Sequence, residues 1–249
     1  MKNILVTGMS RGIGRATTKM LVDEGYFVYG VYNTNKSEAE KIKKELNNVE
    51  IFQCDFSNRD NTLSLVSKLK DIKFYGIVNS AGVFLDIDFD NFDIKAWEDT
   101  FEVNVHTPLL LVQGLKNSLE DGGSIVNISS TDGMVGSALG IAYAASKAAL
   151  INLTQSLANI FASRKIRVNN IAPGWIGDGM QSPKGLLKEA AELNLLKRTG
   201  TYEEIVNVVS FLLSEKASYI NGTTVIVDGG DTATNYILQK ESEILKDQS

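Results

Sequence analysis

The chain opens with an apolar run that passes directly into a glycine-rich turn. Residues 2–7 are typical of a β-strand, Gly8-Met-Ser-Arg-Gly-Ile-Gly14 follows, and a helical pattern begins there. Glycine permits a tight turn and a close approach of the backbone to a ligand, and the unpaired N–H groups at a helix start attract anions. A strand, a glycine turn and a helix in this order therefore predict an α/β protein that binds a dinucleotide at the turn.

Short apolar segments and helical patterns alternate along the rest of the chain, as they do in α/β proteins. The expected strands are residues 27–32, 49–54, 76–79, 124–128, 166–171 and 223–227. The expected helices include residues 38–46, 58–69, 96–115, 186–195 and 201–213, and one that begins near residue 143. A length of 249 residues with 43% hydrophobic residues suits one domain, placed at residues 1–230, with a weakly helical tail at 231–249.

The composition limits the kinds of partner that we expect the protein to bind and indicates its cellular compartment. A net charge of −5 argues against nucleic acid or an anionic membrane as a partner. The one cysteine, Cys54, lies in an apolar strand and is expected to be a buried structural thiol, and the one histidine, His106, excludes a His-pair metal site. We expect no metal. We also expect a cytoplasmic protein, because no leader and no apolar run of about 20 residues is seen.

The end of the second expected strand bears on the choice between NAD and NADP. An acidic residue there would bind the ribose 2′-hydroxyl of NAD, but the first acid after Tyr32 is Glu38. Basic and polar groups stand there instead and suit a 2′-phosphate. They are Arg11 in the glycine turn with Asn33, Thr34 and Lys36. The sequence thus favours NADP, although Lys36 alone is equally well explained as the start of a solvated helix.

Polar and small residues end the next two strands. Asp55, followed by Phe56, suits a hydrogen bond from the adenine amino group, and it suits equally well the N-cap of the helix that follows. Asn79-Ser-Ala-Gly82 leaves room for a ligand against the backbone, because Ser80, Ala81 and Gly82 are small. The alternative for Asn79 is a structural one, in which its side chain bonds a neighbouring strand.

The segment from Ser129 to Lys147 carries the groups with the clearest chemical use. Ser130 follows the strand at 124–128, and open α/β sheets bind their ligands at the carboxyl ends of strands. Tyr143 and Lys147 are four apart on a helix and share a face. An ammonium near the phenol would lower the tyrosine pKa from about 10, which suits an acid that protonates a carbonyl oxygen. A packed tyrosine beside a snorkelling lysine is the plainer alternative.

The helical pattern at 96–115 contains Pro108. A proline has no N–H, so it cannot donate to the carbonyl four residues back, which belongs to Asn104. We expect a kink there whose freed carbonyl holds a water and links Lys147 to solvent as a proton relay. The alternative is a kink that affects packing alone. We do not expect His106 to be catalytic, because the helix turns it away from Asn104.

The segment after the sixth expected strand has the composition of a lid. Residues 177–185 are rich in glycine, and the helical run at 186–195 is amphipathic, so we place a substrate lid at about 177–200. Trp175 and Met180 give it apolar groups, whereas Asp178 and Gln181 offer polar groups that suit hydroxyls.

Taken together, these motifs resemble those of the short-chain dehydrogenase/reductases over residues 2 to about 230. The matches, in order and spacing, are Thr7-Gly8-x-x-x-Gly12-Ile13-Gly14, Asp55, Asn79-x-Ala81-Gly82, Asn104, Ser130, Tyr143-x-x-x-Lys147, Pro173-Gly174 and Asp228-Gly-Gly230. The resemblance implies a Rossmann-type, doubly wound α/β fold with a seven-stranded parallel sheet in the order 3-2-1-4-5-6-7 and helices on both faces. It also implies a homodimer or homotetramer that packs through the helices carrying Asn104 and Tyr143.

The resemblance also implies roles for individual residues. Tyr143 is the acid/base, Ser130 orients the substrate oxygen, Lys147 lowers the tyrosine pKa and binds the nicotinamide ribose, and Asn104 supports the relay. Hydride then passes to or from C4 of the nicotinamide. The expected cofactor-binding set is Gly8, Ser10, Arg11, Gly12, Ile13, Gly14, Asn33, Thr34, Lys36, Asp55, Phe56, Asn79, Ala81, Gly82, Tyr143, Lys147, Pro173, Gly174 and Ile176.

Within that family the chain is most similar to the 3-oxoacyl-acyl-carrier-protein reductases of fatty acid biosynthesis. Three positions depart from their pattern. Ser80 stands where a second Asn is usual, and Asp178 where a Thr usually contacts the nicotinamide amide. Glu120-Asp121 stands where those reductases carry basic residues that meet the acidic carrier protein, with Arg164-Lys165 as the nearby basic pair. Acidic residues there would repel an acidic carrier.

Three functions therefore remain open on the sequence. The leading one is an NADPH-dependent carbonyl reductase, with 3-oxoacyl thioesters as one substrate class. The second is a reductase or dehydrogenase of a sugar, polyol or other biosynthetic intermediate. The third is a nucleotide-binding protein without turnover, which has no need of Asn104, Ser130, Tyr143 and Lys147 together.

Overall fold

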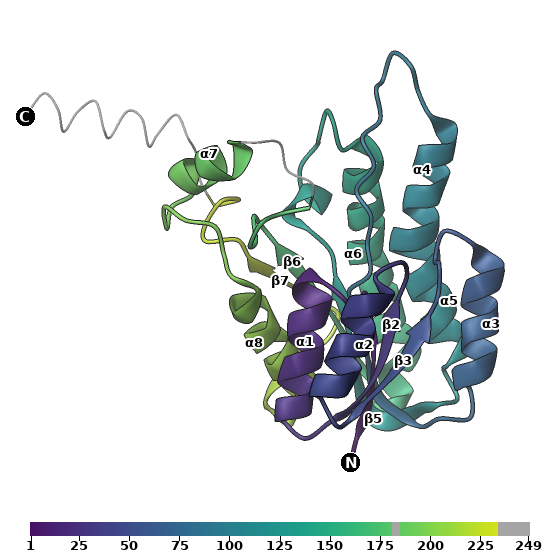
Figure 1. The fold of residues 1–249 in the computed structure, drawn as a ribbon. Helices are drawn as coiled ribbons and strands as arrows, with labels where there is room; N and C mark the ends of the chain where they lie inside the picture. Colours follow the sequence, from purple (N-terminus) through teal and green to yellow (C-terminus); the bar gives the residue numbers. More distant parts are fainter. Residues whose placement is uncertain (181–184, 234–249) are drawn as a thin grey trace, which may run out of the picture.

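The structure, a computed structural model, describes residues 1–180 and 185–233 and contains a sheet of seven parallel strands. The strands are β1 (Asn3–Thr7), β2 (Phe27–Tyr32), β3 (Val49–Gln53), β4 (Phe74–Asn79), β5 (Leu119–Ile128), β6 (Arg167–Pro173) and β7 (Thr224–Val227). Their order across the sheet is β3-β2-β1-β4-β5-β6-β7, which confirms the predicted fold class (Figure 1).

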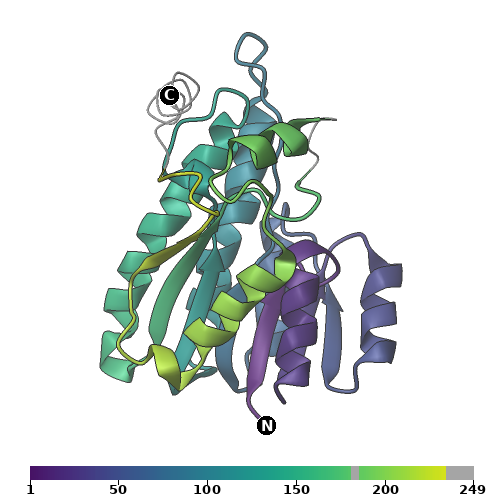
Figure 2. The same cartoon turned by 90° about the vertical axis from the view of Figure 1, so that its left-hand side faces the viewer.

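Helices cover both faces of this sheet (Figure 2). They are α1 (Gly12–Asp23), α2 (Lys36–Glu45), α3 (Arg59–Leu69), α4 (Ile94–Phe101), α5 (Thr107–Gly114), α6 (Ile141–Phe161), α7 (Leu186–Leu193) and α8 (Tyr202–Leu213). Alternate residues of β1 point to opposite faces, so Ile4 and Val6 pack with α1, α2 and α8. Leu5 packs on the other face with residues of α3, α5 and α6. Two apolar cores therefore hold the sheet between two helical layers.

The helix predicted at 96–115 is wrong in detail. A π-helix at Glu102–His106 separates α4 from α5, and the Thr107 N–H donates to the Glu102 carbonyl five residues back. Pro108 then lies in the first turn of α5, where a missing N–H costs little. The proline thus interrupts the α-helical hydrogen bonds as expected, but the backbone forms a wider π-helical turn at this point. Such turns are frequent at functional sites.

Other boundaries differ from the predicted ones by a few residues. Strand β5 begins at Leu119 and β4 at Phe74, both earlier than expected, and α7 ends at Leu193. Helix α7 lies beyond the carboxyl ends of the strands (Figure 1). The expected lid at 177–200 includes residues 181–184, and the expected tail includes 234–249; both ranges lie outside the described residues. Within the described part of the chain, no helix has the length and apolar character to cross a membrane.

Candidate active site

Strand β5 and helix α6 bring Ser130, Tyr143 and Lys147 together. Ser130 stands two residues after β5, in extended backbone, and its hydroxyl accepts from the Asp132 N–H at 3.1 Å, which starts the short 3-10 turn Thr131–Gly133. That turn packs against α6, where a Cβ on Gly133 would lie 2.8 Å from the Lys147 carbonyl carbon. This close packing seats Ser130 beside Tyr143, and their side chains are hydrogen-bonded.

Tyr143 and Lys147 share one face of α6 as their spacing predicts. The Lys147 Nζ atom lies 5.4 Å from the Tyr143 ring centroid and donates to the Ile128 carbonyl at 2.9 Å. Both side chains are buried, with 8% and 4% exposure. A buried ammonium is costly unless it is hydrogen-bonded, so the bond to Ile128 fixes where the lysine head lies.

The pKa values differ from the sequence-based expectation. Burial raises the pKa of Tyr143 to about 12, the Ser130 hydrogen bond opposes that rise, and the nearby Asp132 carboxylate adds to it. Burial lowers the pKa of Lys147 to about 8. Desolvation outweighs the attraction that we expected between ammonium and phenolate, because both groups are removed from water. The tyrosine is therefore protonated at neutral pH.

Asn104 is held at the centre of the π-helix and points inward. Its Oδ1 accepts from the Val83 N–H at 2.9 Å, while its Nδ2 donates to the Val83 carbonyl and to the Ser146 hydroxyl, each at 3.0 Å. A Cβ on Gly82 would lie 3.3 Å from Lys147 Nζ and 3.4 Å from Asn104 Oδ1. The predicted catalytic side chains from α6 and the π-helix therefore meet at the small residues that follow β4.

The glycine turn fits the phosphates of a dinucleotide. Gly8 and Gly12 have φ of 71° and 51°, in the region that favours glycine. A Cβ on Gly14 would overlap the Gly8 carbonyl oxygen, so α1 can approach β1 this closely with glycine alone. Arg11 is the N-cap of α1 and makes no side-chain cap hydrogen bond, which leaves the first N–H groups of α1 to an anion.

Side chains around the turn close the phosphate end of the site. The Met9 N–H donates to the Val31 carbonyl at 3.0 Å, so the turn lies beside the end of β2. There Asn33 donates to Asp55 at 3.3 Å and is exposed together with Thr34, Arg11 and Lys36. Lys36 lies 3.7 Å from Glu40, as expected for the start of a solvated helix.

Two open alternatives are resolved by hydrogen bonds. The N-cap of α3 is Asn58, whose side chain accepts from the Asp60 N–H, so the alternative of an Asp55 N-cap is wrong. Asp55 instead accepts from the Ser57 N–H and hydroxyl. Asn79 does bond a neighbouring strand, because its Nδ2 donates to Asn127 at 2.8 Å. Its buried Oδ1 has no donor among the described residues, and Asn79 is the last residue of β4.

The residues after β6 form the opposite wall. The Gly174 N–H donates to the Val227 carbonyl, and a Cβ on Gly174 would lie 2.8 Å from the Asp228 Cβ. Pro173 and Ile176 are buried. Beyond α7, the buried Asn194 donates to the Asp228 carbonyl at 2.6 Å, so the segment after α7 is tied to the turn after β7.

Two aromatic residues that sequence reasoning missed lie in this region. The Phe84 ring centroid is 5.2 Å from that of Tyr143, and Phe84 is only two residues beyond Gly82, which would have been the signal. Tyr202, the first residue of α8, donates its hydroxyl to Asp178. The two are far apart in sequence and no spacing pattern connects them.

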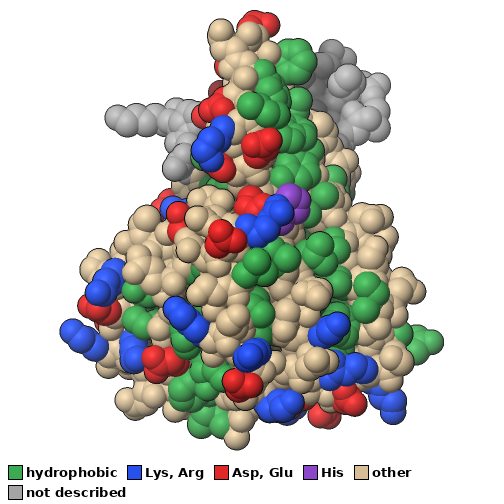
Figure 3. Space-filling view, turned by 90° about the vertical axis from the view of Figure 1, so that its right-hand side faces the viewer, with side chains coloured by type: hydrophobic (Ala, Val, Ile, Leu, Met, Phe, Trp, Pro, Cys, Tyr) green, Lys and Arg blue, Asp and Glu red, His purple; other side chains and the backbone are tan. Residues whose placement is uncertain are grey.

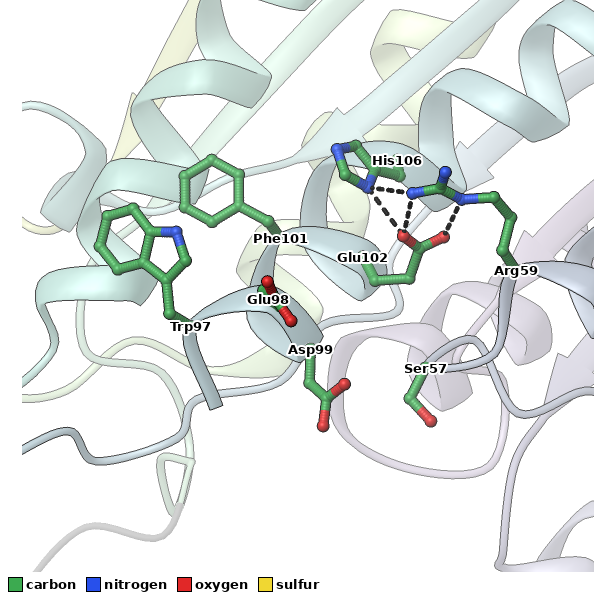
Figure 4. A pocket seen from close by; sticks show the side chains of 8 residues that line it. All are labelled: Ser57, Arg59, Trp97, Glu98, Asp99, Phe101, Glu102 and His106. Carbon is green, nitrogen blue, oxygen red and sulfur yellow. Dashed lines mark hydrogen bonds and ion pairs between the residues drawn. The ribbon is translucent and has the colours of Figure 1, made fainter. Parts of the chain in front are cut away.

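A pocket elsewhere on the surface contains none of the predicted site residues. It is lined by Ser57, Arg59, Trp97, Glu98, Asp99, Phe101, Glu102 and His106 (Figure 4). Arg59 donates to Glu102 from two nitrogens at 3.0 and 2.5 Å and lies 3.0 Å from the His106 Nδ1 atom. The Arg59 hydrogen bond lowers the pKa of Glu102, so the carboxylate is charged. His106 therefore faces an ion pair on the outer side of the π-helix, opposite to Asn104.

Comparison with known proteins agrees with this geometry. A family profile described as "Enoyl-(Acyl carrier protein) reductase" matches residues 8–232. The chain is 36% identical to Protein FixR of Bradyrhizobium diazoefficiens over 241 residues, which cover 92% of this chain and 86% of FixR. It is 35% identical to 3-oxoacyl-[acyl-carrier-protein] reductase FabG of Staphylococcus aureus over 92% of this chain and 97% of FabG. The crystal structure of BdcA in complex with NADPH superposes with a TM-score of 0.85, at 29% identity and coverage of 92% and 93%.

Proposed function

Because the chain belongs to the short-chain dehydrogenase/reductase family and is an NAD(P)-dependent oxidoreductase acting on carbonyl or hydroxyl groups, we propose that it is an NADPH-dependent carbonyl reductase. The observation that carries this proposal is a connected set of four side chains. Lys147 and Asn104 lie beside Gly82, the Tyr143 ring lies beside Lys147, and Ser130 is hydrogen-bonded to Tyr143. A proton donor, a hydroxyl beside it and a buried amine then stand where the glycine turn and the residues after β6 would hold the nicotinamide.

When bound, the nicotinamide supplies a hydride to the carbonyl carbon. The carbonyl π electrons move to the oxygen, which takes the proton of the Tyr143 hydroxyl and becomes an alcohol. Ser130 orients that oxygen from its place beside Tyr143. Lys147 then favours return of a proton to the phenolate, and the π-helix around Asn104 gives the proton a route to solvent. This relay stays a prediction, and its structural basis is the interruption at Pro108.

The proposed preference for NADPH rests on the phosphate end of the site. Arg11 is exposed at the N-terminus of α1, and the Met9–Val31 hydrogen bond places its turn beside Asn33. A guanidinium binds phosphate with two donors, and no acid directly follows Tyr32 to bind the ribose of NAD instead. BdcA, a relative in structure, binds NADPH.

For the substrate, we propose a 3-oxoacyl thioester or a comparable apolar ketone. Apolar side chains are exposed on the segments that flank the site. They are Met134, Val135 and Leu139 before α6, Leu193 at the end of α7, and Leu195 and Leu196 after it. Such groups suit an acyl chain better than a polyol, and Asp178, a polar lid group, is already bonded to Tyr202. FabG, a relative in sequence, acts on a 3-oxoacyl group.

The acidic residues Glu120 and Asp121 affect the proposed binding of a carrier protein and not the reaction at the candidate active site. They lie near the start of β5, where the strand bulges, whereas Ser130 follows the other end of the strand. Asp121 is also paired with Arg164 at 2.7 Å. We therefore propose that these acids disfavour an acidic carrier protein while leaving small thioesters free to react.

We further propose that residues 1–230 act as one cytoplasmic catalytic domain with a lid at about 177–200, assembled as a homodimer or homotetramer. Exposed apolar side chains gather beside the His106 cluster, on the face that α4 and α5 form (Figure 3). They include Phe92, Ile94 and Leu109. Apolar groups of this kind are covered when copies of a chain associate.

The experiment is a comparison of NADPH and NADH oxidation by the purified protein. The substrates are short 3-oxoacyl thioesters, small ketones and polyhydroxy ketones. Turnover of thioesters or apolar ketones with NADPH is expected. Turnover restricted to polyhydroxy ketones would indicate that the enzyme acts on sugars or polyols. Equal rates with NADPH and NADH would contradict the proposed cofactor preference.

A further inference from the structure

The two ends of the expected lid segment lie side by side and form a neck. The Gly177 N–H donates to the Gly200 carbonyl at 2.8 Å, and the Gly200 N–H donates to the Trp175 carbonyl at 2.9 Å. These bonds pair residue 176 with residue 200 as a short parallel bridge. Any movement of the lid relative to the sheet therefore acts on this neck and on what holds it.

Tyr202 stands between the neck and the glycine turn. Its hydroxyl donates to Asp178 Oδ1, on the first turn of the lid. A Cβ on Gly12 would lie 3.6 Å from Tyr202 Cε1, and a Cβ on Gly177 would lie 2.6 Å from Tyr202 Cζ. The ring thus lies beside both glycines. A side chain at residue 177 would collide with it, whereas a Cβ at residue 12 would be in ordinary van der Waals contact.

This contact connects two loops that the sheet keeps apart. The glycine turn follows β1 and the lid follows β6, and β4 and β5 lie between them. Three strand spacings of about 4.8 Å separate β1 from β6, roughly 14 Å in all. The dinucleotide has to lie across that distance, from the phosphates at the turn to the nicotinamide near β6. Tyr202 spans the two loops from the side of α8.

The local structure fixes Tyr202 firmly. It is the first residue of α8, next to a capping box in which Thr201 and Glu204 each bond the other's backbone N–H. Arg198 donates to both oxygens of Glu204, at 2.9 and 2.6 Å. A residue at such a fixed helix start can hold its neighbours, because little freedom remains to be lost.

The Tyr202 hydroxyl also determines where the negative charge of Asp178 lies. The Tyr202 hydrogen bond lowers the pKa of Asp178, so a carboxylate stands at the base of the lid. A loose carboxylate there would repel the diphosphate of a dinucleotide. The hydroxyl of Tyr202 holds the Asp178 carboxylate by a hydrogen bond, and the positive charge of Arg11 acts on the same tyrosine.

We propose that Tyr202 is a positioning residue of the dinucleotide site, which fastens Asp178 and the lid neck to Gly12 and thereby retains the bound cofactor. This inference rests on the proposed function, since it takes the glycine turn as the place where a dinucleotide binds. It also accounts for Asp178, the position that departs from the family pattern.

The test is a double-mutant cycle on the dissociation constant for NADPH, measured by the change in NADPH fluorescence on binding. Tyr202→Phe removes the hydroxyl and keeps the ring, and Asp178→Ala removes the acceptor. Each single change is expected to weaken binding about three- to tenfold, the range of an ordinary hydrogen bond, because Asp178 is exposed to solvent. The double variant is expected to bind no more weakly than either single variant, because one shared contact is lost.

Tyr219→Phe is the matched control, because Tyr219 is fully exposed and should leave the affinity unchanged. The emission of Trp175, read in a Trp97→Phe background, should shift in both Tyr202→Phe and Asp178→Ala, because Trp175 belongs to the neck. An unchanged dissociation constant in Tyr202→Phe overturns the inference, and so does tighter binding in Asp178→Ala, which would indicate repulsion alone. A wild-type protein that does not bind NADPH contradicts the proposed function itself.

Discussion

At the scale of single residues, Tyr143 and Lys147 carry the proposed proton transfer, and both side chains are buried. With a pKa of about 12 the Tyr143 hydroxyl keeps its proton throughout the physiological range, while the pKa of Lys147 falls to about 8. A protonated phenol can donate to a carbonyl but cannot accept from an alcohol. A protonated Tyr143 at neutral pH is therefore consistent with the proposed carbonyl reduction.

A pH dependence follows from these two values. Below pH 8 Lys147 is an ammonium and can return a proton toward Tyr143; above it the charge is lost while Tyr143 is still protonated. We expect kcat/KM for carbonyl reduction to fall as pH rises through about 8, since kcat/KM reports the free enzyme. Initial rates between pH 6 and about 10 measure this. Lys147→Arg should move the fall to higher pH or remove it, because arginine keeps its charge. A fall at the same pH in that variant would show that another group is titrating.

At this scale, the sequence predicted those features of the site that depend on residues close together in the chain. The spacing of Tyr143 and Lys147 and the strand before Ser130 were local patterns, and the structure brings these residues together. The pKa of Tyr143 was expected to fall and instead rises, because it depends on burial by distant segments. The partnership of Tyr202 with Asp178 joins two loops that meet only in the folded protein.

At the scale of elements, the start of α8 combines several stabilising contacts. Thr201 accepts from the Glu204 N–H, and Glu204 accepts from the Thr201 N–H at 2.8 Å. This box orders the segment that leads out of the lid and places Tyr202. Loss of this capping box is expected to lower the stability of the protein and to loosen the segment that carries Tyr202.

Thr201→Ala should lower the melting temperature by about 2–4 °C, the loss expected for one N-cap in a protein of this size. Differential scanning calorimetry measures the change. Thr201→Ser keeps the hydroxyl that accepts from Glu204 and should melt close to the wild type. Equal destabilisation by both variants would mean that the methyl group, not the cap, is what matters.

Element types were predictable, and several boundaries were not. Alternating apolar strands and helical patterns gave the seven strands in the right order once the family resemblance was used. The π-helix at Glu102–His106 was not expected, because Pro108 alone does not tell a kink from a wider turn. Asp55 and Asn58 both suit an N-cap, and only the hydrogen bonds show that Asn58 takes that place.

At the scale of the whole molecule, the face formed by α4 and α5 is expected to be covered by a second copy. Light scattering after size-exclusion chromatography should give two or four times the chain mass of 27.2 kDa. Leu109→Asp places a charge on an exposed apolar position of α5 and should shift the mass toward the monomer. Lys41→Asp, on exposed α2 away from this face, serves as the control. A monomeric wild type would contradict the expected assembly.

The central claim is that Tyr143 gives the proton while a hydride moves from the cofactor to a carbonyl carbon. The most direct measurement uses NADPH with deuterium at both hydrogen positions of C4 of the dihydronicotinamide and a carbonyl substrate that the enzyme turns over, followed by mass spectrometry of the product. The account predicts one deuterium on the new alcohol carbon with the wild type. With Tyr143→Phe it predicts almost none, while NADPH still binds. Product without the label, or labelled product formed at the wild-type rate by Tyr143→Phe, would contradict it.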